Sequence, residues 1–350
     1  MTKLSPRPVP KPKAALRVLG AIRLSLLSEL REDEFENLAA LLEQDPLFKK
    51  LRDRGVIRNA RLPNAGWAYR FDALEADKFP GANGTGYSEF LADNRGLLDV
   101  VRGIGPRLFE RYFLYREHSL PPEELAEACG ITPGLARDLE RFVDSWRVIA
   151  LTAAPRGRGP EAPAHSRVAS VRREGRRFEL DYASLAVARG VYALDRTRLE
   201  SLRERGDLDS RDRGRLDRLL RTVELLNERK SSLHRVLEHV LAKQRAFLLA
   251  EDPGKLLPFS QKEAASDLDM PASRVCRLLA RRSLLLPWGE EQPLKFLFPS
   301  RRTVGRRWVR ALLATRPGST DEELRRMIQR RYGINVSRRT VNLYAQGSRR

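Results

Sequence analysis

The stretch STDEELRRMIQRRYGINVSRRTVNLYAQ, residues 319–346, contains the clearest local signals for the structure of the C-terminal part of the chain. Ser319 and Glu322 have the spacing of a capping box, which marks the start of a helix. Gly333 interrupts the apolar repeat of this helix, and Ser337 stands where the cap of a following helix is expected. The stretch therefore predicts two helices joined by a short turn.

The positive charge of the chain is concentrated around this stretch. Residues 301–350 contain 14 arginines and no lysine against three acidic residues, a net charge of +11, and the whole chain of 350 residues carries +20. Such a charge repels the chain from itself unless a polyanion is bound. Nucleic acid is the first candidate for that partner and an anionic membrane surface the second, while a solvated basic tail is the alternative for the last residues.

A second segment, residues 259–283, has the same organisation and reads FSQKEAASDLDMPASRVCRLLARRS. Ser260 and Glu263 predict a capped helix, and Pro271 predicts the start of a second helix after a short turn. Three arginines of this second helix stand three and four residues apart, so we expect their guanidinium groups on one helix face. The candidate DNA contacts of this segment are Ser273, Arg274, Arg277 and Arg281.

Both segments have the form of a helix-turn-helix unit, one over residues 260–282 and one at the C-terminal end. The second helix of such a unit fits the major groove, where an arginine bonds both acceptors of a guanine. Arg338 and Arg339, on the first turn of the last helix, are expected at base edges. Thr340 and Tyr344, four residues apart, are expected at the DNA backbone or sugars. Helical hairpins with solvated basic faces are the alternative, but two such units in one basic region favour DNA binding.

The rest of the chain predicts a mainly α, multi-domain protein with one small β-hairpin element. Apolar residues at helical spacing predict two helices within residues 14–51, broken near Glu32, and one long helix over residues 209–249. Alternating apolar residues on either side of REGR, residues 173–176, predict the hairpin. Residues 52–89 are rich in Gly, Pro and Asn and predict a linker with little regular structure.

Residue types that carry catalysis or bind metals are sparse. Cys129 and Cys276 have no CxxC partner, so they predict neither a disulfide framework nor a zinc site. The four histidines and the acidic residues suggest no catalytic group, so we expect no enzyme, no metal and no cofactor. The chain shows neither a secretory signal nor an apolar run of about 18 residues, which predicts a cytoplasmic protein without a membrane span.

Two glycine-containing motifs are interpreted as ordinary loop or turn segments. GANGTGYS, residues 81–88, lacks the phosphate-binding loop pattern and predicts a surface loop. GIGPRLFERY, residues 103–112, is either a turn that presents backbone amides to a phosphate or a plain Gly-Pro turn between helices, and the plain turn is favoured.

The segment VSRRTVNLYAQ, residues 336–346, resembles the signature box of sigma-54 type RNA polymerase sigma factors. The pattern of that box is Ala-Arg-Arg-Thr-Val-Ala-Lys-Tyr-Arg-Glu. The matching residues are Arg338, Arg339, Thr340, Val341 and Tyr344, and the departures are Ser337, Asn342, Leu343, Ala345 and Gln346. The resemblance implies that this helix, with the box at 337–346, reads the GG of an upstream promoter element.

Two further blocks resemble the same family in the same order. ERKSSLHRVLEHVLAKQRAFLL, residues 228–249, resembles the helix that precedes the family's helix-turn-helix, and LPWGEEQPLKFLF, residues 286–298, resembles the turn that follows it. Lys295 in that turn is a further candidate DNA contact. Between the blocks, the family's Met-His-Glu-Ser-Thr-Val-Ser-Arg is replaced by Met-Pro-Ala-Ser-Arg-Val-Cys-Arg at residues 270–277, which departs from the family's recognition helix.

The resemblance implies a domain order and a function. The expected order is a disordered basic leader (1–13), N-terminal regulatory helices (14–51), a linker (52–89), a domain that binds core RNA polymerase (90–205), a DNA-binding domain (206–300) and a C-terminal DNA-binding domain (301–350). Promoter DNA, core RNA polymerase and an activator ATPase are the implied partners of such a bacterial transcription initiation factor. The alternative is a DNA-binding repressor or competitor that has lost productive polymerase contacts.

Overall fold

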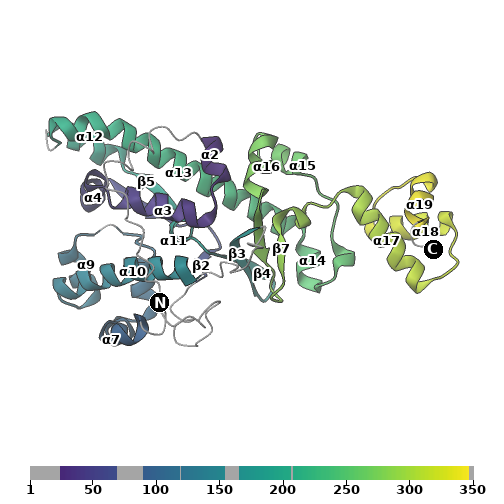
Figure 1. Ribbon diagram of the computed structural model, residues 1–350, viewed down its shortest axis with the longest axis horizontal. Coiled ribbons are helices and arrows are strands. Elements are labelled where there is room, and N and C mark those ends of the chain that lie inside the picture. The colour runs from purple at the N-terminus through teal and green to yellow at the C-terminus, as the bar shows by residue number, and fades with distance from the viewer. Residues whose placement is uncertain (1–23, 69–89, 119, 154–164, 206–207, 347–350) are drawn as a thin grey trace, which may run out of the picture. The chain divides into compact units, whose positions relative to one another are not determined.

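The computed structural model describes residues 24–68, 90–118, 120–153, 165–205 and 208–346 (Figure 1). It divides into two compact units. Unit 1 comprises Met1–His234 with Arg281–Ser283, and unit 2 comprises Arg235–Ala280 with Leu284–Arg350. The described chain is mainly helical, as predicted, with a sheet of five strands and a sheet of two. The expected basic leader at 1–13, the motif at 81–88 and the last two arginines lie outside the described residues.

Residues 24–53, the described N-terminal part of unit 1, form three short helices, whereas two were expected over residues 14–51. They are α2 (Leu24–Glu29), α3 (Glu32–Glu43) and α4 (Pro46–Asp53). The additional break falls at Asp45, whose carboxylate accepts from the backbone N–H of Leu47 at 2.9 Å and caps α4. Pro46 takes the first position of that helix, where its missing N–H has no intrahelical partner to lose.

The inward face of α3 carries buried carboxylates beside its apolar side chains. Glu36 and Glu43 are buried, and Arg147 donates to both of them. Arg189 and Tyr192 also donate to Glu43, at 3.1 and 2.7 Å. Burial by itself raises the pKa of Glu43. The charges of Arg147 and Arg189 lower it by more, so the pKa of Glu43 is below its usual value. These contacts make α3 part of the core of unit 1.

Residues 57–67 contain two strands, so the expectation of little regular structure in that segment is wrong. β1 (Ile57–Ala60) pairs antiparallel with β5 (Val191–Leu194). β2 (Ala65–Trp67) pairs parallel with β4 (Arg177–Tyr182). Both partners are distant in the sequence, so no local pattern reveals this pairing.

The predicted hairpin is present and forms the centre of the larger sheet. β3 (Ser166–Glu174) pairs antiparallel with β4 and ends at the pair Glu174↔Arg177, with Gly175 at φ +58° in the turn. The order of strands in this sheet is β2-β4-β3-β6-β7, where β6 is Arg282–Leu285 and β7 is Glu291–Pro293.

The remaining elements of unit 1 are mostly helices, and α9 packs along α10 (Figure 1). The motif at 103–112 forms a turn between α7 and α8 with Gly105 at φ +90°. Trp67 of β2 packs edge-on against Trp146 of α10, with ring centroids 4.9 Å apart. The bounds are α7 Arg95–Ile104, α8 Pro106–Phe109, a π-helical turn Glu110–Leu114, α9 Pro122–Cys129, α10 Pro133–Ala153, α11 Leu185–Ala188 and α12 Arg196–Glu204.

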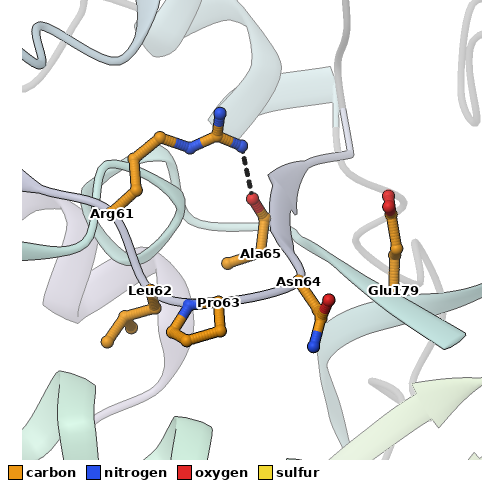
Figure 2. Close-up of a pocket in the computed structure, with 6 residues that line it drawn as sticks. All are labelled: Arg61, Leu62, Pro63, Asn64, Ala65 and Glu179. Carbon is orange, nitrogen blue, oxygen red and sulfur yellow. Dashed lines mark hydrogen bonds between the residues drawn. The ribbon is translucent and has the colours of Figure 1, made fainter.

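A shallow hollow lies between the β1–β2 loop and β4 (Figure 2). Arg61 donates to the carbonyl of Ala65 at 2.7 Å, and its guanidinium group lies 4.1 Å from the centroid of the Tyr115 ring. Arg61 therefore closes the loop rather than presenting its charge to a ligand. The hollow is lined by Arg61, Leu62, Pro63, Asn64, Ala65 and Glu179.

The long predicted helix is interrupted near its end. α13 covers Ser210–Lys243, and α14 (Arg245–Ala250) follows after Gln244. The amide of Gln244 is fully buried and donates to the carbonyls of Leu257 and Leu297 at 2.9 and 3.0 Å. Gln244 thereby joins three segments of unit 2. Within the described residues no helix is long and apolar enough to cross a membrane.

Unit 2 continues with one pair of short helices and then a group of three helices. After a 3-10 turn (Pro253–Lys255) come α15 (Gln261–Asp267) and α16 (Ala272–Leu279), and a further 3-10 turn covers Leu294–Leu297. The last three helices are α17 (Arg301–Thr315), α18 (Asp321–Tyr332) and α19 (Arg338–Ala345). They enclose their own apolar core of Val304, Trp308, Val309, Leu312, Leu324, Ile328, Val341, Tyr344 and Ala345.

Candidate nucleic-acid interface

α18 and α19 form the helix pair that the C-terminal sequence predicts, but the first cap is shifted by one residue. Thr320, not Ser319, caps α18, and Glu323, not Glu322, completes the capping box. Glu322 instead accepts from Arg325 and Arg326 at 2.8 to 3.0 Å. Hydrogen bonds from Arg325 and Arg326 lower the pKa of this exposed carboxyl to about 2. The cap differs by one residue from the predicted one because the stretch contains two possible capping boxes, Ser319 with Glu322 and Thr320 with Glu323.

The turn and the start of α19 agree with the sequence. Gly333 ends α18 at φ +69°, a conformation that glycine adopts without strain. The Ser337 hydroxyl accepts from the backbone N–H of Thr340 at 3.1 Å and caps α19. Arg338 and Arg339 occupy the first turn of that helix and are both exposed.

Tyr344 lies on the core-facing side of α19, whereas it was expected to face DNA. Its side chain is 8% exposed and belongs to the core of α17, α18 and α19, next to Val341 and Ala345. The expectation that Thr340 and Tyr344 share a face toward DNA is therefore wrong for Tyr344. Thr340 is half-buried at the edge of the core-facing side, and its hydroxyl lies 2.8 Å from that of Ser337.

The 3.6-residue turn of α19 separates the two arginines. Relative to the buried residues Val341, Tyr344 and Ala345, Arg339 points almost directly away from the core. Arg338 lies at the margin of the exposed face, about 100° round the helix axis from Arg339. Arg338 also lines a surface hollow at the start of α18, formed with Gly318, Ser319, Thr320, Asp321 and Glu322. The two arginines are therefore suited to different contacts.

α17 adds arginines that the sequence analysis included only in a charge count. Arg301, Arg302, Arg306 and Arg310 are all exposed on this helix, whose other side is buried. None of them forms an ion pair with a carboxylate within the part of the chain that the structure describes. Arg302, Arg306 and Arg310 stand four residues apart beside the buried Val304 and Trp308, and this spacing is the sequence signal of such a face.

The other predicted helix pair, α15 and α16, begins as expected. The Ser260 hydroxyl accepts from the backbone N–H of Glu263 at 3.1 Å, and the carboxylate of Glu263 accepts from the N–H of Ser260 at 2.7 Å. Pro271 directly precedes α16, and Met270 before it is buried.

α16 is shorter than the predicted second helix. Ser273 is exposed and Arg274 and Arg277 are half-buried on this helix. Arg281 lies beyond its end at Leu279 and has a left-handed φ of +54°. The expectation that Arg281 shares a helix face with the other two arginines is therefore wrong. Lys295, the remaining candidate, is exposed on the 3-10 turn Leu294–Leu297.

Two kinds of comparison with known proteins give a match, one to solved structures and one to a family model. A comparison with curated proteins gives no match. Among solved structures, Aquifex aeolicus sigmaN bound to promoter DNA is similar at a TM-score of 0.39 and 16% identity, over 64% of this chain and 85% of that chain. The family model of the sigma-54 DNA-binding domain matches residues 213–347, which confirms the resemblance noted in the sequence. Over residues 213–347 the chain is therefore similar to the sigma-54 DNA-binding domain.

Proposed function

We propose that this protein is a sigma-54-like transcription initiation factor that binds core RNA polymerase and directs it to promoter DNA. The observation that carries the proposal is the exposed arginine face of α19, which lies inside the region matched to the sigma-54 DNA-binding domain. Both helix pairs, α15 with α16 and α18 with α19, act in this proposal as helix-turn-helix units. Each places its second helix in a major groove.

The geometry of α19 supports different roles for its two arginines. Arg339 points away from the core, so it is the residue we assign to the guanines of a GG element, where its planar fork bonds O6 and N7 together. Arg338, at the margin beside the start of α18, is assigned to a phosphate. The exposed arginines of α17 supply further phosphate contacts, which position the domain without reading sequence.

Unit 1 supplies the polymerase contacts in this proposal, through residues 90–205. The N-terminal helices restrain promoter opening until an activator ATPase acts. Because α3 is held by buried ion pairs, such a restraint acts through helices that remain packed in unit 1. An activator would then change contacts made by the outer surface of these helices rather than detach them.

A second candidate is a repressor or competitor that binds promoter DNA without productive polymerase contacts. Two observations favour it, both at α16. The family's His, Glu and Thr positions are occupied by Pro271, Ala272 and Arg274, and Arg281 lies off the helix. A protein with these changes retains the DNA contacts of α19 but reads a different downstream element.

Purified chain mixed with core polymerase at micromolar concentration distinguishes the two functions by size-exclusion chromatography. Co-elution, followed by binding of the complex to GG-containing duplex, supports the initiation factor. Binding of the free chain to the same duplex without co-elution supports the repressor. If the chain binds neither polymerase nor GG-containing duplex above a scrambled duplex, the proposed function is wrong.

A further inference from the structure

The outward face of α19 carries one large apolar side chain. Leu343 is 49% exposed, and Leu108 and Val148 are the other exposed large hydrophobic side chains among the described residues. The core side of α19 is already filled, and Leu343 lies outside the apolar core of its own domain. An apolar side chain exposed on a helix that is assigned to DNA contacts is suited to an apolar group on DNA.

Leu343 shares its helix face with Arg339. Residues four apart in a helix are neighbours on one side, and both of these point away from the core formed by Val341, Tyr344 and Ala345. Four residues advance a helix by about 6 Å, whereas successive base pairs are about 3.4 Å apart along DNA. A side chain at Leu343 therefore reaches a base one to two steps from the base that Arg339 contacts.

The neighbouring polar residues do not compete for that position. Asn342 donates to Asp321 at 2.7 Å and accepts from the amide of Gln346 at 2.9 Å. Both groups of the Asn342 side chain are thus used within the domain. Leu343 is left as the exposed large apolar side chain beside Arg339.

The chemistry of the major groove offers one apolar group on the base edges of DNA, the C5-methyl group of thymine. We infer that Leu343 is a specificity-determining residue, which contacts the methyl group of a thymine one to two base steps from the guanine bound by Arg339. This inference rests on the proposed function, since it requires α19 in the major groove. It makes the recognised element a GG step with a thymine at a fixed distance.

The first experiment selects the preferred site from duplexes with a fixed GG and randomised flanks, using the full chain. A thymine enriched one or two steps from the GG is expected for the wild type. The enrichment is expected to disappear for Leu343→Ala, while the preference for GG remains. Thermal unfolding of the variant checks that the domain is intact, which we expect because the side chain is half exposed.

The second experiment replaces the enriched thymine by uracil, which differs only by the missing methyl group. Wild-type affinity is expected to fall about fourfold, the value for losing contact with one buried methyl group. Leu343→Ala is expected to bind both duplexes equally. Leu108→Ala, which removes an exposed leucine from unit 1, is the matched control and keeps the wild-type discrimination.

The outcomes separate the inference from the proposed function. Equal wild-type affinity for thymine and uracil duplexes, with GG still preferred, overturns the role of Leu343 alone. Discrimination that persists in Leu343→Ala also overturns it, because the methyl group is then contacted by another residue. Absence of any preference for GG overturns the proposed function and the inference together.

Discussion

Gly305 of α17 lies directly against the ring of Tyr344 of α19. A Cβ atom at position 305 would stand 2.3 Å from Cε2 of Tyr344 and 2.9 Å from Cδ2, closer than real side chains approach. Gly305 thus allows α17 and α19 to pack at short distance, and the tyrosine of the signature box has a structural role in this contact. The backbone at Gly305 is helical, so the requirement is for space and not for an unusual φ.

We expect Gly305→Ala to destabilise the C-terminal helices by about 1–3 kcal/mol. The reason is overpacking against a ring that is held in a filled core, and the better helix propensity of alanine offsets only part of it. Gly214→Ala is the matched control, because Gly214 also lies in a helix but has nothing within 4 Å of its added Cβ. That control is expected to be neutral or slightly stabilising. Chemical denaturation measures both, and equal stability of the two variants would contradict the packing role.

Glu32 at the start of α3 is buried between two arginines. It accepts from Arg229 at 2.6 Å and from Arg282 at 3.0 Å. Burial by itself raises the pKa of Glu32, but the charges of the two arginines lower it by more, so its pKa is below the usual value. Removing one member of such a buried pair leaves an uncompensated charge, so Glu32→Gln is expected to cost about 3–5 kcal/mol of unfolding free energy.

The control for that variant is Glu34→Gln on the same helix. Glu34 is exposed and completes the capping box with the backbone N–H of Arg31 at 2.8 Å. Glutamine retains this bond, so a change within about 0.5 kcal/mol is expected. If both variants lose the same stability in urea titrations, the buried charges do not hold α3 in place.

Lys230 provides a test by pH. Its ammonium group is fully buried, donates to the carbonyl of Gly190 at 2.8 Å and lies 3.7 Å from the centroid of the Tyr192 ring. Burial lowers the pKa of Lys230 to about 7, against the opposing effect of Glu43 and Glu36. Between that value and the unfolded value of 10.5, the unfolded chain holds a proton that the folded chain lacks. The contribution of Lys230 to stability therefore rises with pH in this window.

The measurement is the unfolding free energy of the wild type and of Lys230→Met between about pH 8 and pH 9.5. The wild type is expected to gain up to about 1.4 kcal/mol per pH unit relative to the variant. Lys49→Met, at an exposed position of α4, is the control and is expected to keep the wild-type slope. Identical slopes for the wild type and Lys230→Met would show that Lys230 stays protonated in the folded chain.

Local sequence signals predicted the helices that begin or end at a capping residue. They missed strands that form through contacts between segments that are distant in the sequence. Ser260, Gly333 and Ser337 act where the sequence places them because a cap is defined by residues three or four positions away. β1 and β2 were missed because their partners, β5 and β4, are remote in the sequence. Tyr344 was assigned to DNA because helical spacing shows which residues share a face but not which face is buried.

Salt dependence tests the arginine face of α17. Each phosphate contact releases counterions, so the logarithm of affinity is expected to fall by about 0.9 per log unit of salt for every contact. Arg302→Ala combined with Arg306→Ala is expected to reduce this slope by about 2 and to weaken GG and scrambled duplexes alike. Arg141→Ala, an exposed arginine of unit 1, is the control and leaves the slope unchanged. A wild-type slope of only about 0.9, which corresponds to a single phosphate contact, is incompatible with DNA binding by this face.

The two arginines at the start of α19 provide the most direct test of sequence reading. Arg339 points away from the core and is assigned to the guanines, so Arg339→Ala is expected to cost about 1–3 kcal/mol on GG-containing duplex and much less once the GG is changed. Arg338, at the margin beside α18, is assigned to a phosphate, so Arg338→Ala should weaken both duplexes by the same factor. Fluorescence anisotropy titrations at one fixed salt concentration measure the four affinities. If the two variants exchange these behaviours, Arg338 reads the guanines and α19 enters the groove rotated by about 100° from the orientation inferred here. If both weaken the two duplexes alike, α19 contributes charge without reading sequence.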